Sequence, residues 1–463
     1  MRAIVDPDNT LARGLAEIRR QFQVPDNFPQ PVLDAAAEAA RRVPSQHTSR
    51  TGWDFVTLDP ASSTDLDQAF RIERSGEDLL LHYAIADVDW FVQDGDAIDT
   101  EAWLRGATLY LPDGKAGLYP PVISEGAASL LPSGDRPAVI LTIRVGADGE
   151  ARFEGAERAL IRSRAKLAYD QVRPEDLPAG FTELAERMAI AEARRGAARV
   201  DPPEQEVHAV DGGYALVFRP VLESEVRNAA MSLAANLAVA AALLERRTGL
   251  FRVMAEPDAR AVRRLRHTAD AFGLDWPGME TLSQFERGLD PREPKQAAMM
   301  LAIRRAGRGA AYQAYRESET PWHSAVAAPY AHATAPLRRL ADRYVLRALL
   351  AIANGEKPPA TATEAIATLP EVMARANARG AQIEHAVVDL AEAVMLQGRE
   401  GETYFAVVTD VDERGARMQL CALPIVARVS AQKVGPGDQI QVRLVEADPG
   451  RRSVRFERVS GSA

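Results

Sequence analysis

The sequence predicts an α+β fold in three consecutive parts. These are a short helical N-terminal element over 1–48, a large α+β domain over 49–396, and a C-terminal β-barrel of the OB type over 397–463. Two observations predict this division. Strand-like apolar runs alternate with long helical patterns through the middle of the chain, whereas only short strands separated by turn residues follow it. With 463 residues, 46% of them hydrophobic, the chain is long enough for more than one core.

The N-terminal element contains two helix-like stretches, 11–22 and 31–43. The segment between them carries Pro25 and Pro29, which interrupt a helical pattern. The simplest interpretation is that both helices pack against the domain that follows. A small helical element that binds RNA is the alternative.

Strands and helices are both expected in the large domain. The clearest are two strands and two long helices, at 79–86, 138–145, 225–247 and 370–397. Residues 202–218 suggest a hairpin whose turn consists of Asp211, Gly212 and Gly213. This mixture predicts an α+β domain.

The C-terminal part contains five short strand-like runs, at 404–411, 418–420, 426–429, 439–446 and 453–459. Turn residues such as Gly415 and the segment 435–438 separate them. Five short strands in this length fit an OB barrel, a common platform for single-stranded nucleic acid. Residues 401–463 carry nine basic and eight acidic side chains, so we expect the barrel to assist binding rather than dominate it.

Global features narrow the class of protein. Cys421 is the single cysteine, so no disulfide can form within the chain and a reducing compartment fits. The N-terminus lacks the apolar core of a signal peptide. The apolar stretch 229–244 is too short for a membrane span and predicts a buried helix. We expect a cytoplasmic monomer without membrane contact.

The most informative segment is 54–70, where Asp59, Asp65 and Asp67 fall within nine residues. Carboxylates this close repel one another unless a cation or a proton relieves them. Mg²⁺ takes oxygen ligands, usually one or two carboxylates together with substrate phosphates. From the spacing alone, a Mg²⁺ or Mn²⁺ site is about as well supported as the alternative, in which the acids are simply solvated side chains of a turn. A calcium loop is disfavoured because no glycine follows the acids.

The order of residues in this segment supports a shared site. In extended backbone, alternate side chains point to opposite sides, so Asp65 and Asp67 should face one way and Leu66 the other, toward a core. Pro60, followed by serine and threonine residues, predicts a turn that returns Asp59 toward that pair.

A second segment, 330–342, combines histidine, threonine, proline and arginine. Pro336 suits the first turn of a helix, with Thr334 as a possible cap. Arg338 and Arg339 would then lie near the helix start, where the helix dipole does not favour cations. An anion is the better partner for arginines placed there.

The surrounding region is basic in an acidic chain. Residues 301–351 contain eight arginines and three acids, a local charge of +5, whereas the whole chain has a formal net charge of −9. Such a region is typical of phosphate binding. An ordinary solvated helix face is the alternative.

Together the two segments resemble the ribonuclease II family of 3′→5′ exoribonucleases. The catalytic RNB domain of that family carries Asp-(x)5-Asp-x-Asp-Asp-Ala and Tyr-x-His-x-Thr-Ser-Pro-Ile-Arg-Arg-Tyr-x-Asp. The resemblance spans about 50–395 in order and implies an RNB-type catalytic domain over 49–396, followed by an OB barrel of the ribosomal-protein S-one type. The first 48 residues are too few for the paired cold-shock barrels that usually open family members, so the chain resembles a short form.

The resemblance implies a site for Mg²⁺, or for Mn²⁺, held by Asp59, Asp65, Asp67 and Gln68. Gln68 stands where the family has a fourth acid. Its carbonyl can ligate Mg²⁺ but brings no charge. The resemblance gives catalytic roles to Asp67, which is tied most directly to the chemical step, and to Arg338, which would stabilise charge developing on the phosphate.

Six side chains are expected to contact RNA. Tyr110 matches the aromatic that holds the 3′-terminal nucleotides. Glu384 falls where the family contacts the ribose 2′-hydroxyl, with a solvated helical acid as the alternative. Phe251 is a candidate for base stacking, with a core position as the alternative. The remaining three, which would contact phosphate or order the loop at Arg338, are His332, Thr334 and Arg339.

The sequence therefore predicts a Mg²⁺-dependent hydrolytic exoribonuclease that acts on the 3′ end of single-stranded RNA and releases nucleoside 5′-monophosphates. The alternative is a non-catalytic RNA-binding relative, in which Gln68 marks a decayed metal site. Retention of Asp67 and Arg338 favours the enzyme. A metal-dependent phosphatase for small substrates would explain neither the barrel nor the basic region.

Overall fold

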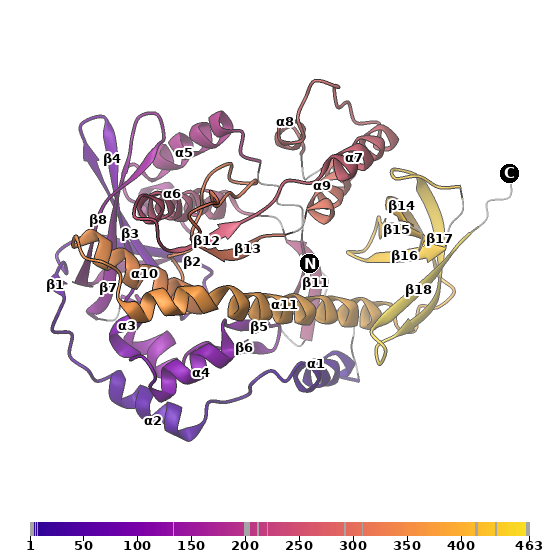
Figure 1. The fold of residues 1–463 in the computed structure, drawn as a ribbon. Coiled ribbons are helices and arrows are strands. Elements are labelled where there is room, and N and C mark those ends of the chain that lie inside the picture. Colours follow the sequence, from indigo (N-terminus) through magenta and orange to yellow (C-terminus); the bar gives the residue numbers. More distant parts are fainter. Residues whose placement is uncertain are drawn as a thin grey trace.

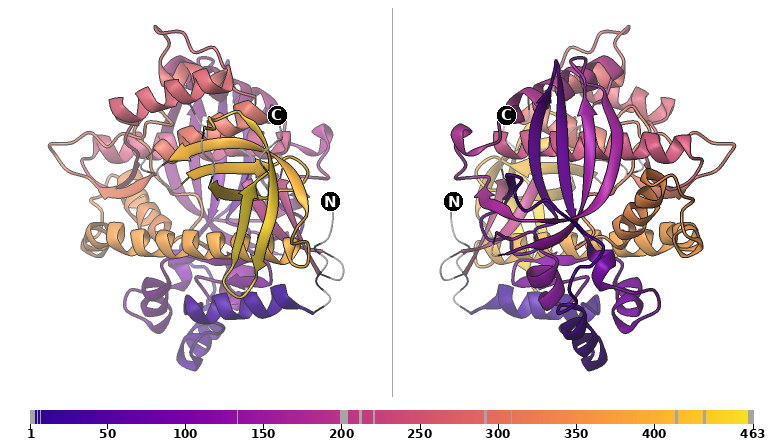
Figure 2. Two further views of the ribbon diagram at one scale, coloured as in Figure 1. Left: turned by 90° about the vertical axis from the view of Figure 1, so that its right-hand side faces the viewer. Right: turned by 90° about the vertical axis from the view of Figure 1, so that its left-hand side faces the viewer.

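The computed structural model describes residues 4, 6, 8–132, 134–198, 204–210, 213–219, 221–290, 293–307, 309–412, 415–430 and 433–459. It confirms the predicted architecture of N-terminal helices, a mixed α and β domain and a C-terminal barrel (Figure 1). A twisted sheet forms the centre of the large domain, and one long helix leads from this domain to the barrel (Figures 1 and 2).

The central sheet has seven strands in the order β1-β8-β7-β4-β3-β2-β9. It is antiparallel except at its two edges, where β1 pairs with β8 and β2 with β9 in parallel. The strands are β1 (Thr48–Ser49), β2 (Phe55–Asp59), β3 (Gln68–Ser75), β4 (Asp78–Ala86), β7 (Arg136–Val145), β8 (Ala151–Ile161) and β9 (Ser163–Ala168). The strands predicted at 79–86 and 138–145 are β4 and β7, which are neighbours in the interior of the sheet. An interior position explains why both are almost continuously apolar.

Helices α6 (Glu223–Glu245) and α10 (Leu340–Ala353) pack on strand β8 of the sheet and against each other, and α5 (Phe181–Arg195) packs against α6 (Figure 1). Among the described helices, α6 is the one whose length and composition would suit a membrane span, yet 61% of its most apolar window is buried inside the protein. The prediction of a buried helix at this place is confirmed. Its alanine-rich faces allow close approach of the neighbouring elements.

Helix α11 (Ala360–Leu396) is longer than the sequence suggested. The predicted start at Pro370 was wrong, because the helix begins ten residues earlier and continues through the proline. A proline inside a helix removes one hydrogen bond. Buried Leu369 and Met373 flank it in the core of the large domain, and this packing offsets the loss. Farther along, Ile383 and Leu390 belong to a second core that includes the barrel.

The two N-terminal helices, α1 (Thr10–Gln21) and α2 (Gln30–Ala39), pack against the rest of the chain as expected. Helix α1 lies so close to α11 that a Cβ atom on Gly14 would come within 2.5 Å of Leu390 Cδ2. Helix α2 packs against α4 (Ala97–Arg105). It ends at Ala39, four residues before the predicted end at Val43.

All five predicted strands of the barrel are present, and the barrel is closed in the order β14-β15-β16-β18-β17. They are β14 (Thr403–Asp412), β15 (Gly415–Leu420), β16 (Val426–Ser430), β17 (Gln439–Asp448) and β18 (Ser453–Arg458). The predicted hairpin is formed by β10 (Glu204–Val210) and β11 (Gly213–Arg219). Two of its expected turn residues, Asp211 and Gly212, lie outside the described residues.

The shorter elements connect these parts. They are α3 (Val88–Phe91), β5 (Leu109–Leu111), β6 (Gly114–Ala116), a π-helix (Val122–Ala127), a 3-10 helix (Pro174–Asp176), β12 (Leu250–Val253), α7 (Ala259–Phe272), α8 (Leu282–Arg287), α9 (Pro294–Ala306) and β13 (Ala311–Ala314). Helices α7, α8 and α9 share a small core of their own. Helix α9 also contacts strand β14, so this core lies beside the barrel (Figure 1).

A buried carboxylate ties the barrel to the large domain. Glu392 on α11 is 4% exposed. Its Oε1 atom accepts hydrogen bonds from Gln205 Nε2 on β10 (2.6 Å) and from the backbone N–H of Val426 on β16 (2.8 Å). Burial raises the pKa of Glu392 to about 7. One side chain thus joins the hairpin, the long helix and the barrel.

We expect Glu392→Gln to stabilise the protein above pH 7. The variant keeps an oxygen that accepts both hydrogen bonds and removes a charge whose burial is unfavourable. Because folding raises the pKa of Glu392 from 4.5 to about 7, the ionised group opposes folding fully above about pH 7 and much less by about pH 5. Urea unfolding at both pH values measures the difference. Glu371→Gln, an exposed acid on the same helix, is the control. Equal stabilisation at both pH values would contradict the explanation.

Candidate active site

Two neighbouring strands position the acidic segment. Asp59 is the last residue of β2, and Asp67 immediately precedes β3, which pairs with β2. The loop between them turns at Pro60, whose carbonyl accepts a hydrogen bond from the N–H of Ser63 (3.0 Å). The predicted turn is therefore present.

The predicted alternation of side chains in this loop is confirmed. Leu66 is completely buried, and its N–H donates to Ser129 Oγ (2.9 Å). The carboxylates of Asp65 and Asp67 lie near the hydroxyl of Tyr110, and burial together with these two negative charges raises the pKa of that hydroxyl. A buried leucine between them thus fixes the direction in which both acids point.

Asp67 is the most strongly held of the three acids. Its side chain is 7% exposed. Oδ1 accepts a hydrogen bond from the backbone N–H of Leu337 (2.7 Å), and Oδ2 lies 3.4 Å from Arg338 Nε. Burial raises the pKa of Asp67 to about 7, although Arg338 and the Leu337 N–H both act in the opposite direction. The carboxylate needs further positive charge to be fully ionised at neutral pH.

The backbone of Arg338 is fixed by a short segment that follows α4. The N–H of Thr108 donates to the carbonyl of Arg338, and the N–H of Leu340 donates to the carbonyl of Gly106, both at 3.0 Å. The side chain of Arg338 is 42% exposed and borders the acids. It is anchored through its backbone and remains accessible at its guanidinium.

The helix expected to begin at Pro336 begins at Leu340, so this part of the prediction was wrong. Residues 336–339 form a tight turn in which the N–H groups of Arg338 and Arg339 both donate to the carbonyl of Ala335. The buried carboxylate of Asp342 stabilises the turn, because it accepts hydrogen bonds from the Ala335 N–H (2.9 Å) and from Arg339. Thr334 does not cap the helix.

The other two acids differ in their partners. Burial raises the pKa of Asp59 to about 6, and the charge of Asp65 adds to this, although Arg338 and Lys166 act in the opposite direction. Asp65 forms an ion pair with Lys115 (2.7 Å), which also contacts Glu125 (3.1 Å). Lys115 lies on β6 directly across from Tyr110 on β5. An ammonium group therefore pairs directly with Asp65, whereas Asp59 has only the less direct charges of Arg338 and Lys166 to oppose the effect of its burial.

Gln68 does not face the other acids as a ligand, and the expectation that it helps to hold a metal was wrong. Its Oε1 atom accepts hydrogen bonds from Tyr83 and from Ser232 Oγ (3.3 Å), and its Nε2 donates to the carbonyl of Thr334 (2.6 Å). Both the oxygen and the nitrogen of the Gln68 amide thus form hydrogen bonds within the protein. Gln68 links β3 to α6 and to the segment that carries Arg338.

We expect Gln68→Ala to lower the free energy of unfolding by about 1–3 kcal/mol, since it leaves the buried Tyr83 hydroxyl and the Thr334 carbonyl without this partner. Gln382→Ala, at an exposed position of α11, is the matched control. Urea unfolding compares the two variants. Equal stability of both variants would show that the Gln68 amide does not support the fold.

Tyr110 and Glu384 come together although 274 positions separate them in the sequence. Both line one cavity of about 640 Å³, together with Ser62 from the acidic loop and residues of β10. The Tyr110 side chain is 56% exposed, and Glu384 is exposed on α11. The structure thus brings the two side chains to one cavity, and their contacts with RNA stay predictions.

The other residues that were expected to contact RNA are buried or paired with neighbouring side chains. Phe251 is completely buried in the core of the large domain, so the prediction of base stacking was wrong and the core alternative holds. Thr334 is 2% exposed. His332 Nδ1 lies 3.1 Å from the Tyr312 hydroxyl, and burial and nearby arginines lower its pKa well below the ordinary value. Arg339 is paired with Asp342 at 2.6 Å.

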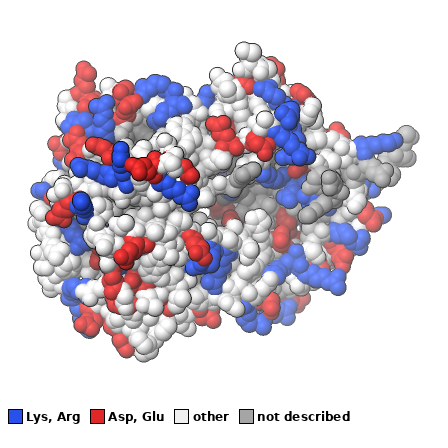
Figure 3. Space-filling view, viewed as in Figure 1, with Lys and Arg blue, Asp and Glu red and all other residues white. Residues whose placement is uncertain are grey.

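Several arginines of the predicted basic region form ion pairs within the protein. Arg343 is 1% exposed and forms ion pairs with Asp89, Asp94 and Asp99 at distances of 2.7–3.1 Å. Arg347 pairs with two of the same acids. Arg343 and Arg347 on α10 therefore belong neither to a phosphate-binding surface nor to a solvated helix face. Over the face in Figure 3, basic and acidic side chains are interspersed, with basic side chains gathered over α7.

Sequence reasoning missed Lys115, Tyr169 and Asn228. Asn228 Nδ2 donates to the Tyr169 hydroxyl (2.9 Å) and contacts the carbonyl of Leu58 beside Asp59 (3.3 Å). Burial raises the pKa of Tyr169, and the nearby charge of Asp59 acts in the same direction. A lysine is rare in this chain, with five against 51 arginines, and that rarity is the one signal that pointed to Lys115.

Within the described part of the chain, no group of three or more histidine, cysteine, aspartate or glutamate side chains is arranged to hold a metal ion. The three acids nevertheless lie around shared partners. Arg338 lies 3.4 Å from Asp67 and also acts on Asp59, and Asp65 and Asp67 both act on the hydroxyl of Tyr110. Their joint role as metal ligands stays a prediction.

Comparisons with known proteins agree with this geometry. A family model described as the RNB domain matches residues 49–355, and one described as the RNase II-type exonuclease C-terminal S1 domain matches residues 402–459. Ribonuclease R of Aquifex aeolicus is 26% identical over 95% of this chain and 69% of its own length. The chain spans 53% and 54% of the ribonuclease R proteins of Lactococcus lactis and Mycoplasma pneumoniae.

Two solved structures illustrate the range of the fold. Apo ribonuclease R of Mycoplasma genitalium has a TM-score of 0.86, with 20% identity, over 99% of this chain and 79% of that chain. Yeast Ssd1, described as a pseudonuclease, has a TM-score of 0.67, with 16% identity, over 95% of this chain and 57% of that one. Since the RNB match covers more than half of the sequence, the chain belongs to the RNB family of hydrolytic exoribonucleases, and its barrel is the S1 domain of the RNase II type.

Proposed function

We propose that this protein is a Mg²⁺-dependent exoribonuclease that removes nucleotides from the 3′ end of single-stranded RNA and releases nucleoside 5′-monophosphates. One observation carries the proposal. The accessible guanidinium of Arg338 lies 3.4 Å from the buried carboxylate of Asp67, and both charges act on Tyr110, which lines a cavity together with Glu384. This pair is separate from the ion pairs that stabilise the fold, and an arginine beside a buried carboxylate is well placed to act on a reacting phosphodiester.

Some of the side chains at the candidate site are suitable ligands for Mg²⁺, and others are not. Asp59 and Asp65 offer the carboxylate oxygens that Mg²⁺ prefers, and two protein carboxylates suffice when substrate phosphates complete the coordination. Burial and the charge of Asp65 oppose ionisation of Asp59, so a cation beside it is favourable. Gln68 does not fit, because its amide is already bonded within the protein. When bound, the metal would lower the pKa of water and neutralise phosphate charge.

The protein's own residues would bind and orient the end of the strand. The exposed ring of Tyr110 offers a stacking surface for a terminal base, and Glu384 can accept a hydrogen bond from a ribose 2′-hydroxyl. Arg338 can turn toward the phosphate and stabilise the charge that develops as water adds to phosphorus. The bond to the 3′ oxygen of the shortened chain then breaks, and that oxygen takes up a proton.

A time course on 5′-labelled single-stranded RNA and on DNA of the same sequence tests the proposal. With Mg²⁺ we expect a ladder that shortens from the 3′ end on RNA and not on DNA. The same reaction with Mn²⁺ and with chelator establishes the metal requirement. A product ladder on both nucleic acids would reject the assigned role of Glu384. Cleavage inside the strand would reject the exonuclease mechanism.

A non-catalytic RNA-binding protein is the second candidate. The bonded amide of Gln68 and the ion pair between Lys115 and Asp65 favour it, because both reduce the negative charge available to a metal. RNA that stays intact in Mg²⁺ and in Mn²⁺, while the protein still binds it, would establish this candidate instead.

A further inference from the structure

The hairpin that carries Tyr110 is too small to hold its own conformation. Its strands, β5 and β6, have three residues each, and an isolated two-stranded hairpin is only marginally stable in water. Its two-residue turn consists of Pro112 and Asp113. The turns favoured for such hairpins need a positive φ at the first of these positions, whereas the proline ring fixes φ at about −65°. The orientation of Tyr110 therefore depends on contacts from outside the hairpin.

Helix α1 of the N-terminal element supplies such contacts at the turn. The guanidinium of Arg19 donates two hydrogen bonds to the carboxylate of Asp113, from Nε and from Nη2, each at 2.9 Å. Nη2 also donates to the carbonyl of Gly114 (3.1 Å). The side chains of Arg19 and Asp113 are 18% and 27% exposed, so solvent weakens this pair less than a fully exposed one. Two parallel hydrogen bonds fix the direction of the turn as well as its distance from α1.

The same helix supports the buried face of the hairpin. Side chains alternate along β5, so Leu109 points away from the side on which Tyr110 projects. Leu109 and its cross-strand partner Ala116 belong to one hydrophobic core with Leu15 and Ile18 of α1. All four of these apolar side chains are buried, whereas Tyr110 is exposed. Helix α1 thus lies behind the hairpin, and the opposite face presents Tyr110.

Helix α1 is itself anchored to the other elements around the candidate site. Arg379 of α11 donates from Nε (3.0 Å) and from Nη2 (2.7 Å) to the carbonyl of Phe22, the residue that follows the end of α1 by one position. The N–H of Ile4 donates to the carbonyl of Tyr214 on β11 (2.7 Å). The N-terminal element therefore connects the hairpin that carries Tyr110 with α11 and with the β10–β11 hairpin.

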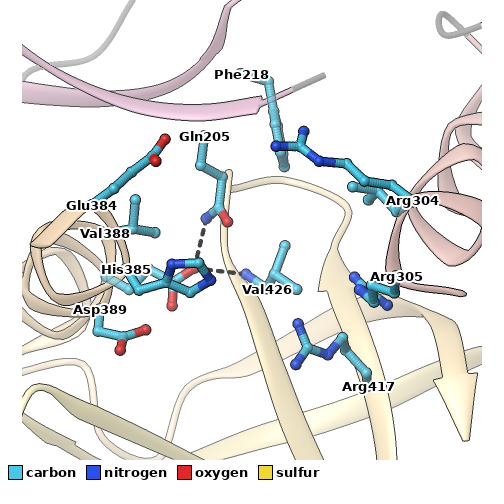
Figure 4. Close-up of a pocket in the computed structure, with 12 residues that line it drawn as sticks. Gln205, Phe218, Arg304, Arg305, Glu384, His385, Val388, Asp389, Arg417 and Val426 are labelled. Atoms are coloured by element: carbon cyan, nitrogen blue, oxygen red, sulfur yellow. Dashed lines mark hydrogen bonds between the residues drawn. The ribbon is translucent and has the colours of Figure 1, made fainter. Parts of the chain in front are cut away.

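A shift of the β5–β6 hairpin would change the cavity at Tyr110 directly. Residues 108–112 form one wall of this cavity, and α11 contributes Glu384, which also lines the adjoining cavity drawn in Figure 4. Lys115, directly across from Tyr110 in the hairpin, pairs with Asp65 of the acidic loop (2.7 Å). The position of this hairpin therefore affects both the cavity and the acids.

We infer that Arg19 is a positioning residue that holds the ring of Tyr110 in the orientation in which it stacks on the 3′-terminal base. The inference rests on the proposed function, since it takes Tyr110 as the residue that binds the end of the RNA. It gives the short N-terminal element a part in substrate binding, although Arg19 is not among the residues that line the cavity. Without the pair between Arg19 and Asp113, the hairpin samples several orientations and the terminal base stacks for a smaller fraction of the time.

The test measures stacking of the 3′-terminal base. The probe is an RNA tetranucleotide with 2-aminopurine, a fluorescent base that stacking quenches, at its 3′ end. The same RNA with 2-aminopurine at its 5′ end is the control probe. Every protein carries Asp67→Asn and chelator is present, so the RNA stays intact. The variants are Arg19→Gln, Asp113→Asn and the two combined. Arg13→Gln, at an exposed position of α1, is the matched control, and Tyr110→Ala gives the complete loss of stacking.

For Arg19→Gln and for Asp113→Asn we expect about half of the quenching at the 3′ probe to be lost and the Kd to rise about threefold, against about fivefold or more for Tyr110→Ala. The combined variant should match the single ones, because both substitutions break the same pair. Arg13→Gln should behave as the parent protein does.

Parental quenching in Arg19→Gln, or losses that add in the combined variant, would overturn the inference. Equal losses at the 3′ and 5′ probes together with lower stability in urea would also overturn it, because general destabilisation does not select the 3′ base. If Tyr110→Ala leaves the quenching unchanged, the role of Tyr110 in the proposed function is rejected, and this inference with it. If Tyr110→Ala abolishes the quenching and Arg19→Gln does not alter it, only the role of Arg19 is rejected.

Discussion

Asp67→Asn is expected to lower the rate of RNA hydrolysis by about two to three orders of magnitude, the loss typical of removing one preorganised electrostatic group from an active site. Asparagine has the same shape, so its oxygen can still accept the hydrogen bond from the Leu337 N–H. What disappears is the negative charge that faces Arg338. Single-turnover hydrolysis of 5′-labelled RNA by equal concentrations of both proteins measures the effect.

Stability provides the control for this variant. The pKa of Asp67 rises from 3.8 to about 7 on folding, so the ionised carboxyl opposes folding above pH 7, and this penalty disappears as pH falls toward the ordinary value. Without divalent cations, Asp67→Asn should therefore be at least as stable as the parent protein at about pH 8. A variant that loses activity because it unfolds would contradict the assignment. So would a variant that remains fully active.

Arg338→Ala is expected to reduce kcat by about two to three orders of magnitude, equivalent to about 3–4 kcal/mol of transition-state stabilisation, while RNA affinity falls much less. The reason is that Arg338 borders the acids with 42% of its side chain exposed and is positioned through its backbone. Arg338→Lys should recover only part of the rate, because an ammonium group cannot form two parallel hydrogen bonds to a phosphate.

The separation of kcat from KM decides the role of Arg338. A role in the transition state lowers kcat, whereas simple attraction of RNA raises KM. The comparison residue is Arg375 on α11, which is exposed and paired with Glu371, and Arg375→Ala should alter neither constant. If Arg338→Ala changes KM alone, the residue binds the strand and does not stabilise the reacting phosphate.

The architecture was largely predictable because its signals are local. Alternating apolar residues and turn residues predicted the five barrel strands, and β4 and β7 followed from their almost continuously apolar composition. The start of α11 was missed because the cost of Pro370 is local, whereas the compensating burial of Leu369 and Met373 depends on distant parts of the chain. The start of α10 was missed because Asp342 stabilises a turn before the helix.

For the candidate site, the sequence by itself determined which side chains are available. It identified the acids, the arginine and the tyrosine, and the period of an extended strand predicted that Leu66 separates Asp65 from Asp67. Only the tertiary structure decided their partners. It placed Lys115 against Asp65 and used the amide of Gln68 within the fold. Hydrogen bonds and ion pairs act over a few ångströms between residues far apart in sequence, so their pairing emerges only when the chain is packed.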